Sequence, residues 1–345
     1  MRVIKGESME RESKVTSKDI AKACGVSQTT VSYVINNTAG VNISEKTRKL
    51  VLETAKRLNY IPNNAARGMR MKSAGSIGVV IGRNTVNIGF NNVLRGIKSV
   101  LDQSGMSITL LHDDQDKLHD AEYMNYYRSG RIDGIVFCFC EIGEEEKRMI
   151  EEKGIPYITA DESGVRGKEL TGQDMLHDAI AQSVDFCVEK GFATMNFFSF
   201  KYGETLFSYK YNIFKDTLTR LMPETSLRRI VIQIKDRERD DIQEEILSII
   251  KSEPCDLAVT PNQRLGLYVQ SAIMKNRLQF PQYPKHICLD TSHMLGNIYP
   301  SVTSLDIPLA AIGEESCKAL LSLIRGEKPE PVEFKAKLKP GTSTE

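Results

Sequence analysis

One short segment carries polar side chains at a spacing that could recognise another molecule. Gln28, Thr29, Ser32 and Tyr33 stand at i, i+1, i+4 and i+5, which places them along one stripe of an α-helix. Their amide and hydroxyl groups can form hydrogen bonds with base edges, and the major groove of B-DNA admits a helix. The stripe therefore predicts a helix that contacts double-stranded DNA.

The residues around this stripe predict a helix-turn-helix. A first helix is expected over residues 17–24, and Gly25 follows it, where the turn favours a positive φ. Ser27 is a suitable N-cap for the second helix. The small Ala21 lets the two helices approach closely, and Val31 returns to their shared core. The other apolar residues expected in that core are Ile20, Val26, Val34 and Ile35.

A third helix is expected to follow, because Ser44 can cap it and Glu45 suits the positive end of its dipole. Its predicted apolar stripe consists of Leu50, Val51, Ala55 and Leu58. The three helices would form an all-α bundle over residues 14–61, preceded by a disordered extension over residues 1–13. An ordinary bundle with no role in DNA binding is the alternative.

The charge distribution favours DNA binding over that alternative. Residues 1–75 contain 14 Lys and Arg against 6 Asp and Glu, a net charge of +8, while the rest of the chain carries −7. A basic head on an acidic body is typical of a protein whose head meets a polyanion.

Residues 62–75 are expected to connect the bundle to the rest of the chain. Pro62 is acceptable at the start of a helix, but a helix of about two turns is marginal in water. Gly68 weakens it further, by roughly 0.5–1 kcal/mol relative to Ala. The segment is therefore predicted to be disordered in the free protein and helical on DNA. A plain flexible linker is the alternative.

Residues 15–72 closely resemble the DNA-binding region of the LacI/GalR family of bacterial regulators. The matching motifs are Val15-Thr16, Asp19-Ile20-Ala21, Gly25-Val26-Ser27, Thr30-Val31-Ser32, Val34-Ile35-Asn36, Ser44-Glu45-Lys46-Thr47-Arg48, Leu58-Asn59-Tyr60, Pro62-Asn63 and Ala66-Arg67. The resemblance implies a homodimer that binds a near-palindromic DNA operator and represses transcription. It also implies that residues 62–75 form a hinge helix in the minor groove.

The family's DNA-contacting residues map onto the head and the linker. The positions implied are Thr16, Ser27, Gln28, Thr29, Thr30, Ser32, Tyr33, Asn36, Asn63, Ala66, Arg67, Met69 and Arg70. Met69 stands where the family has a Leu that wedges between base pairs and kinks the duplex. Tyr33 stands where many members have Arg or His, and it cannot make the bidentate contact of Arg to guanine. The resemblance therefore does not specify the operator.

From residue 76 onward, short apolar runs alternate with amphipathic segments, which predicts an α/β fold with doubly wound parallel sheets. The expected strands are 77–81, 107–111, 134–140, 155–160, 194–199, 229–234, 257–259 and 286–289. The expected helices are 90–104, 120–129, 144–153, 177–190, 208–221, 243–251, 263–275 and 310–326.

In this region the resemblance implies two lobes like those of periplasmic binding proteins. The N-lobe is expected at about residues 76–173 and 307–337, and the C-lobe at about 174–306 and 338–345. The chain would thus cross between the lobes near residues 173, 306 and 337. Because ligands of such sheets bind at the carboxyl ends of strands, the cleft between the lobes is the expected site of a small-molecule effector.

The resemblance also implies which residues line this cleft. They are Asn84, Phe90, Asp161, Asp174, Lys210, Asn262 and Asp290, and each could instead cap a helix or brace a loop. Lys210 replaces the usual Arg and lacks its planar fork. Gln263 follows Asn262 where an Asp is usual. The effector is expected to be a sugar, a phosphosugar or a nucleobase, or there is none.

Any stacking of a sugar against the cleft would need Phe90, Phe207 or Tyr209, because the chain has no Trp. The seven cysteines are expected to be reduced core residues, since they lack the spacing of metal ligands. No cofactor and no metal site are predicted.

Two other classes of protein, a periplasmic receptor and an enzyme, agree less well with the sequence than a DNA-binding regulator does. A periplasmic sugar receptor would fit the two lobes, but it would not need a basic head, and no signal peptide is visible. An enzyme on a Rossmann-like body would need a glycine motif, and Gly78-Val79-Val80-Ile81-Gly82 does not supply G-x-G-x-x-G. No apolar stretch approaches the roughly 20 residues of a membrane span, so a cytoplasmic location is expected.

Overall fold

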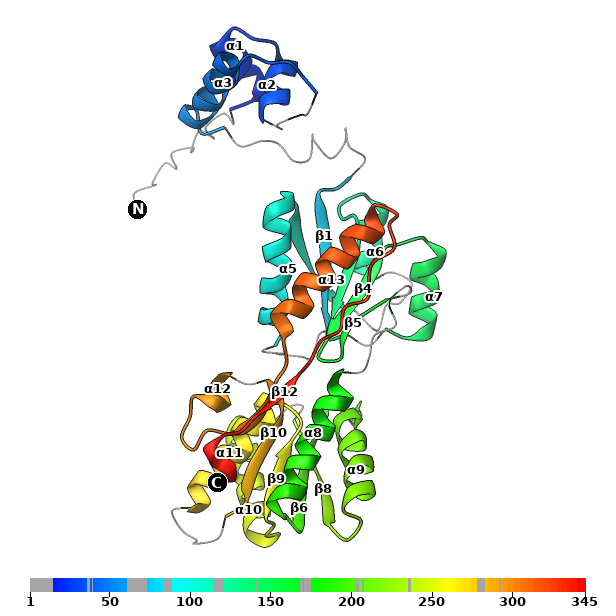
Figure 1. Ribbon diagram of the computed structural model, residues 1–345, viewed down its shortest axis with the longest axis vertical. Coiled ribbons are helices and arrows are strands. Elements are labelled where there is room, and N and C mark those ends of the chain that lie inside the picture. Colours follow the sequence, from blue (N-terminus) through cyan, green and yellow to red (C-terminus); the bar gives the residue numbers. More distant parts are fainter. Residues whose placement is uncertain are drawn as a thin grey trace, which may run out of the picture. The chain divides into compact units, whose positions relative to one another are not determined.

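A computed structural model of the chain (Figure 1) forms two compact units, a helical head that ends at Ser73 and an α/β body that begins at Ala74. The structure describes residues 15–35, 38, 40–60, 73–82, 89–113, 121–140, 142–167, 170, 175–202, 205–206, 208–234, 237–277, 283–291 and 293–345.

The described part of the head is a helical bundle. Its elements are α1 (Ser17–Cys24), α2 (Gln28–Ile35) and α3 (Glu45–Arg57). Gly25 ends α1 with a φ of 65°, a conformation that favours glycine because it has no Cβ. Ile20, Val31 and Val51, one from each helix, are buried together in the centre. The predicted helix-turn-helix is confirmed, including the bounds of its first helix.

The apolar stripe predicted for α3 was wrong at one position. Leu50 is 43% exposed, whereas Thr54 is 4% exposed and takes a place on the buried face. Thr54 lies three residues after Val51 and next to Ala55, so it falls on the same side of the helix. Leu50 directly precedes Val51, so its side chain points about 100° away from the buried side of the helix. The prediction of burial rested only on its apolar side chain.

The first lobe of the body is a mostly parallel sheet covered by helices on both faces. Its strands are β1 (Ser76–Gly82), β2 (Ser107–Asp113), β3 (Ile135–Cys138), β4 (Tyr157–Asp161) and the antiparallel β5 (Gly164–Arg166), in the order β2-β1-β3-β4-β5. Its helices are α5 (Phe90–Ser104) and α13 (Leu309–Ile324) on one face and α6 (Glu122–Arg128) and α7 (Glu144–Glu152) on the other. The predicted alternation of strands and helices is confirmed here, and β5 is an addition to it.

The second lobe repeats this architecture. Its strands are β6 (Thr194–Tyr202), β7 (Thr205–Leu206), β8 (Ser226–Gln233), β9 (Leu257–Thr260), β10 (Lys285–Thr291), β11 (Thr303–Asp306) and β12 (Lys337–Lys339). They run in the order β12-β11-β10-β9-β6, and β6 also pairs with β8 and β7. The covering helices are α8 (Met175–Lys190) and α9 (Tyr209–Leu221) on one face and α10 (Arg239–Ser252) and α11 (Gln263–Arg277) on the other. The short α12 (His293–Gly296) and the 3₁₀ turn η2 (Thr342–Thr344) complete the lobe.

The chain passes between the two lobes in segments far apart in sequence. It leaves β11 at Asp306, enters α13 at Leu309, and returns through residues 327–336 to β12 (Figure 1). Because the helix between these crossovers belongs to the first lobe, the sheet of the second lobe contains strands from before that helix and, in β12, one strand from after it. The crossover expected near residue 173 lies outside the described residues.

The helices α5 and α13 pack with their backbones in contact. A Cβ atom on Gly96 would lie 2.0 Å from the carbonyl oxygen of Ala310, and one on Gly313 would lie 2.0 Å from that of Val93. Only glycine leaves room for such an approach. This contact holds the start of α13, directly after the crossover at residues 306–309, against α5 of the first lobe.

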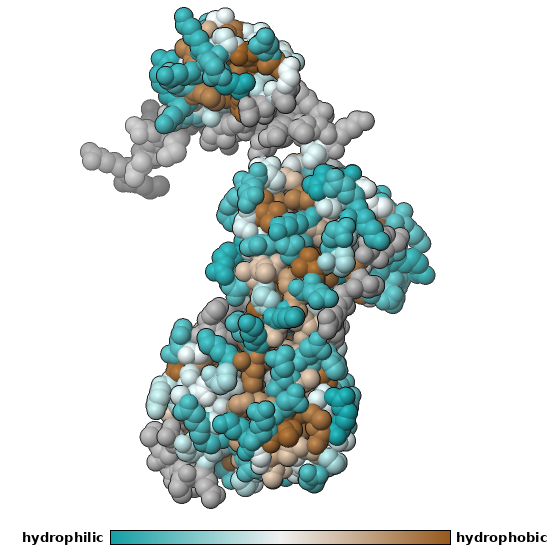
Figure 2. Space-filling model, in the orientation of Figure 1, coloured by the Kyte–Doolittle hydropathy of each residue, from teal (hydrophilic) through white to brown (hydrophobic). Residues whose placement is uncertain are grey.

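The surface of the body mixes hydrophilic and hydrophobic residues over both lobes (Figure 2). In this view the hydrophobic residues form separate small patches. Among the described helices, none has the length and apolar character needed to cross a bilayer.

Candidate DNA-reading face and interlobe cleft

The outer face of α2 presents the polar stripe predicted from the sequence. Gln28, Thr29 and Tyr33 are exposed, while Val31 and Val34 on the opposite side are buried in the bundle. Tyr33 is 37% exposed, so its ring rests partly on the head while part of the side chain is free to meet another molecule. The helix thus offers amide and hydroxyl groups to a groove without losing its core contacts.

Two of the predicted contact residues also hold the ends of helices. The backbone N–H of Thr30 donates to Ser27 Oγ at 3.0 Å, which confirms Ser27 as the N-cap of α2. Thr16 precedes α1, and its backbone N–H donates to the Asp19 carboxylate at 2.8 Å. Gln28 Nε2 donates to Ser17 Oγ at 2.7 Å, joining the first turns of α1 and α2. The amino ends of both helices are therefore held close together on the head.

In the body, Lys210 occupies the centre of the polar contacts between the lobes. Its Nζ donates to the carbonyl oxygens of Pro261 and Leu289, each at 2.8 Å, and lies 2.5 Å from Glu162 Oε2. Burial alone would lower the pKa of Lys210, but the charges of Glu162 and Asp290 raise it above its usual value. The side chain is therefore a fixed ammonium group.

Asp290 and Asn262 lie at the carboxyl ends of neighbouring strands, β10 and β9. The backbone N–H of Gln263 donates to Asp290 Oδ2 at 3.0 Å, and that of Leu265 donates to Asn262 Oδ1 at 2.9 Å. Both side chains thus stabilise the first turn of α11. Gln263 itself is buried, and its Nε2 has no hydrogen-bond partner among the described residues.

Glu162 was not among the residues predicted for the cleft. It directly follows Asp161 in the turn after β4, and it contacts Lys210 and Asp290 of the second lobe. Burial raises the pKa of Glu162 to about 7, an effect that Lys210 opposes and Asp290 reinforces. The signal that could have indicated it is the position: an acidic residue immediately after a strand, at the edge where ligands bind.

The two other described cleft candidates have local roles. Asp161 accepts a hydrogen bond from the backbone N–H of Ser163 at 2.8 Å and forms an ion pair with Arg166. Phe90 begins α5 and is buried in the core of the first lobe. The contacts of Asp161 thus brace the turn after β4, and the ring of Phe90 fills part of the core of the first lobe.

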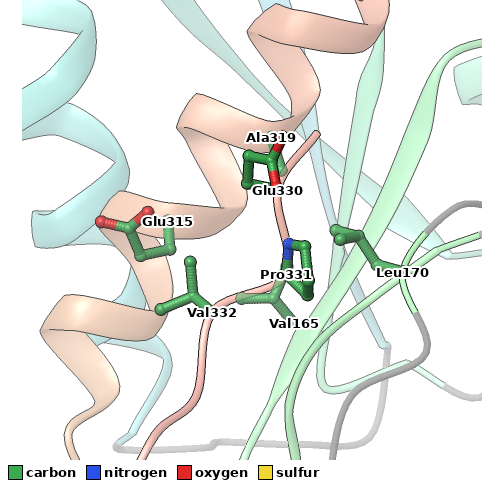
Figure 3. A pocket seen from close by; sticks show the side chains of 7 residues that line it. All are labelled: Val165, Leu170, Glu315, Ala319, Glu330, Pro331 and Val332. Carbon is green, nitrogen blue, oxygen red and sulfur yellow. The ribbon is translucent and has the colours of Figure 1, made fainter. Parts of the chain in front are cut away.

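A separate hollow of about 270 Å³, open to solvent, lies on the first lobe (Figure 3). It is lined by Val165, Leu170, Glu315, Ala319, Glu330, Pro331 and Val332. It lies among β5, α13 and residues 330–332, and none of the effector candidates that the structure describes is among its lining residues. This hollow is distinct from the group around Lys210.

Comparison with known proteins agrees with this arrangement. Residues 16–63 match the model of the family described as "Bacterial regulatory proteins, lacI family". The catabolite control protein A of Staphylococcus xylosus is 25% identical over 317 residues, which cover 91% of this chain and 93% of that protein. The crystal structure of the lac repressor dimer bound to operator and the anti-inducer ONPF superimposes with a TM-score of 0.73 at 18% identity, covering 96% and 99% of the two chains.

The chain thus carries, in residues 16–63, the DNA-binding head of the lacI family of bacterial regulatory proteins. It is a DNA-binding regulator with a helix-turn-helix head rather than an enzyme. The fold predicted for the body, two lobes of the periplasmic-binding-protein type, is confirmed by the likeness to the lac repressor. The complex of the transcriptional regulator CelR with cellobiose has the same fold, with a TM-score of 0.61 and 19% identity over 96% of this chain.

Several site residues predicted for this LacI-family regulator lie outside the described residues. They are Asn36, Asn63, Ala66, Arg67, Met69 and Arg70 for DNA, and Asn84 and Asp174, together with the stacking candidate Phe207, for the effector. Of the remaining effector candidates, the structure brings Lys210, Asn262 and Asp290 to one edge of the second lobe. It adds Glu162 to them from the first.

Proposed function

We propose that this LacI-family regulator binds a near-palindromic operator as a homodimer and represses transcription. We further propose that a small molecule in the interlobe cleft controls its affinity for the operator. The observation that carries the proposal is the exposed polar face of α2, set on a basic head that matches the family. A solved relative of the same fold is described as a dimer bound to operator, which supports the same assembly for this chain.

The base-reading residues of the proposal are Gln28, Thr29 and Tyr33, because they are exposed on α2. Ser27 and Thr16, at the amino ends of α2 and α1, are suited to phosphate contacts, since backbone N–H groups and the helix dipole favour anions there. In the hinge of residues 62–75, Met69 would insert between base pairs, and the Met69→Gly variant would lose specific binding while nonspecific binding persists.

The effector-binding residues of the proposal are Lys210, Asn262 and Asp290, with Glu162 facing them. Effector and operator would be coupled because an effector that favours one arrangement of the lobes shifts the spacing of the two hinges in the dimer. The complex of CelR with cellobiose supports a sugar as one effector class. An Asp290→Ala variant that still responds to the effector would contradict the role of Asp290.

The experiment that tests the proposal is a selection of genomic DNA fragments with the full-length protein at physiological salt. A single near-palindromic motif, with an affinity that falls steeply as salt is raised, is the expected result. Repeating the selection with pools of sugars, sugar phosphates and nucleobases would identify the effector class. Failure to enrich any motif, with and without the pools, would contradict operator binding.

A further inference from the structure

The ion pair of Glu162 and Lys210 connects the two lobes. Glu162 stands in the turn between β4 and β5 of the first lobe, and Lys210 lies in the first turn of α9 in the second. Their charged atoms are 2.5 Å apart, and the side chains are only 15% and 13% exposed. Separation of the lobes would break this contact and expose both charges to water.

In this arrangement of the lobes, Lys210 uses all three of its N–H donors for contacts within the protein. An ammonium group has three N–H donors, and Lys210 directs them to the carbonyl oxygens of Pro261 and Leu289 and to the Glu162 carboxyl group. Two of these acceptors belong to the second lobe, so the cation is held there whether or not the lobes separate. The third bond is the one that reaches the first lobe.

The Glu162 carboxyl group also faces a second acid. The side chains of Glu162 and Asp290 face each other within hydrogen-bonding reach, and the buried Cys288 thiol lies beside the same charges. A carboxylate accepts hydrogen bonds but cannot donate one, so this contact needs a proton on one of the two acids. In the same turn, the charge of Asp161 is offset by Arg166.

We propose that Glu162 and Lys210 form a tie that holds the lobes together, and that the tie takes up a proton through the contact of Glu162 with Asp290. With the proton present, Glu162 accepts from Lys210 and donates to Asp290. Without it, two carboxylates face one ammonium group in a buried site, and the closed arrangement loses stability. The cleft therefore responds to pH as well as to a small molecule. The tie itself does not depend on the proposed operator or effector.

The direction of the pH effect follows from the two states of Glu162. In the closed cleft its pKa is about 7, and in an open, hydrated cleft it would return toward 4.5. The closed state binds the proton more tightly, so its advantage is complete below about pH 4.5 and is lost as the pH rises through 7. Between pH 6 and pH 8 the ratio of closed to open protein should fall about tenfold.

Hydrogen–deuterium exchange of the full-length protein at pH 6, 7 and 8 tests this inference. In the wild type, peptides that cover residues 161–166 and 261–265 should show an opening equilibrium that increases about tenfold over this range, after correction for intrinsic exchange. The Glu162→Gln variant should stay closed and lose the pH dependence, because its amide accepts from Lys210 and donates to Asp290 as the protonated acid does.

The Lys210→Met variant should be open at every pH, with a larger radius of gyration in X-ray scattering. The matched controls are Glu189→Gln on α8 and Lys215→Met on α9, whose side chains are exposed and which should behave as the wild type. Peptides from β1 and from the head report whether each variant is folded. Unchanged protection in Lys210→Met, or an undiminished pH dependence in Glu162→Gln, would overturn the proposal.

Discussion

The carboxylate of Asp133 accepts a hydrogen bond from the backbone N–H of Ala74 at 2.6 Å. Its second oxygen accepts from the N–H of Gly75 at 2.9 Å, and its own N–H donates to the carbonyl of Ser76 at 2.8 Å. Asp133 precedes β3, so it fixes the first residues of the body to the centre of the first lobe's sheet. A displacement of that sheet is therefore carried to the end of the linker.

Replacing Asp133 with Ala should destabilise the body by about 1–3 kcal/mol, since two hydrogen bonds to a partly buried charge are lost. Urea unfolding of the full-length protein measures this change. Asp216→Ala, an exposed acid on α9, is the control and should stay within about 0.5 kcal/mol of the wild type. Equal stability of the two variants would show that the Asp133 contacts contribute nothing.

The close packing of α5 and α13 predicts that Gly313→Ala is strongly destabilising. The added methyl group would meet the Val93 carbonyl oxygen at 2.0 Å, and backbone cannot move aside as a flexible side chain can. Overpacking of this kind typically costs 1–3 kcal/mol, and a contact with backbone should lie toward about 3 kcal/mol. Gly296→Ala is the control, because no atom of the described part of the chain lies within 4 Å of its Cβ position. Thermal unfolding of the two variants should differ clearly in midpoint.

Tyr33→Ala should change the operator preference without unfolding the head. Tyr33 is partly exposed on α2, so its removal leaves the buried residues Val31 and Val34 in place. Loss of a base contact costs about 1–3 kcal/mol at one position of each half-site. Sequencing of DNA selected by the variant and the wild type checks this. If the variant selected the same DNA motif as the wild type, Tyr33 would not take part in base recognition. The control is Thr38→Ala, because Thr38 is an exposed loop residue.

Most helices and strands of the fold were predictable, because apolar residues recur in each with the period of that element. The bounds of α1 follow from Gly25 at one end and a polar first turn at the other. Short edge strands such as β5 and β7 escaped prediction, since two or three residues show no alternation. Periodicity also indicates which face is apolar without saying where the face ends, which is why Leu50 was misplaced and Thr54 overlooked.

The residues of the cleft were predictable only in the second lobe, where polar residues stand at the carboxyl ends of the strands. Asp290 and Asn262 follow strands directly, so their meeting at one edge of the second lobe follows from parallel pairing. Glu162 joins them by reaching across from the other lobe, and no spacing within one lobe indicates a contact of that kind. The engagement of Lys210 by two carbonyl oxygens likewise depends on the tertiary fold.

His286 should make the body sensitive to acid. Its ring is buried between Thr260 Oγ1, 3.0 Å from Nε2, and Gln270 Oε1, 2.8 Å from Nδ1, and burial lowers its pKa to about 3. Unfolding returns the pKa to 6.5, so the unfolded chain takes up the proton first. The contribution of neutral His286 to the free energy of unfolding is present above pH 6.5 and is lost as the pH falls toward 3. The loss amounts to as much as about 4–5 kcal/mol.

Urea unfolding of the wild type and of His286→Leu between pH 7 and pH 4 measures this contribution. At pH 7 the variant should be less stable by about 1–3 kcal/mol, because Thr260 and Gln270 lose a buried partner. Its stability should then decline less steeply with acid than that of the wild type, since the group that takes up the proton on unfolding is gone. His112→Ala, at an exposed position on β2, should keep the wild-type slope. Parallel slopes for His286→Leu and the wild type would mean that other groups cause the acid sensitivity.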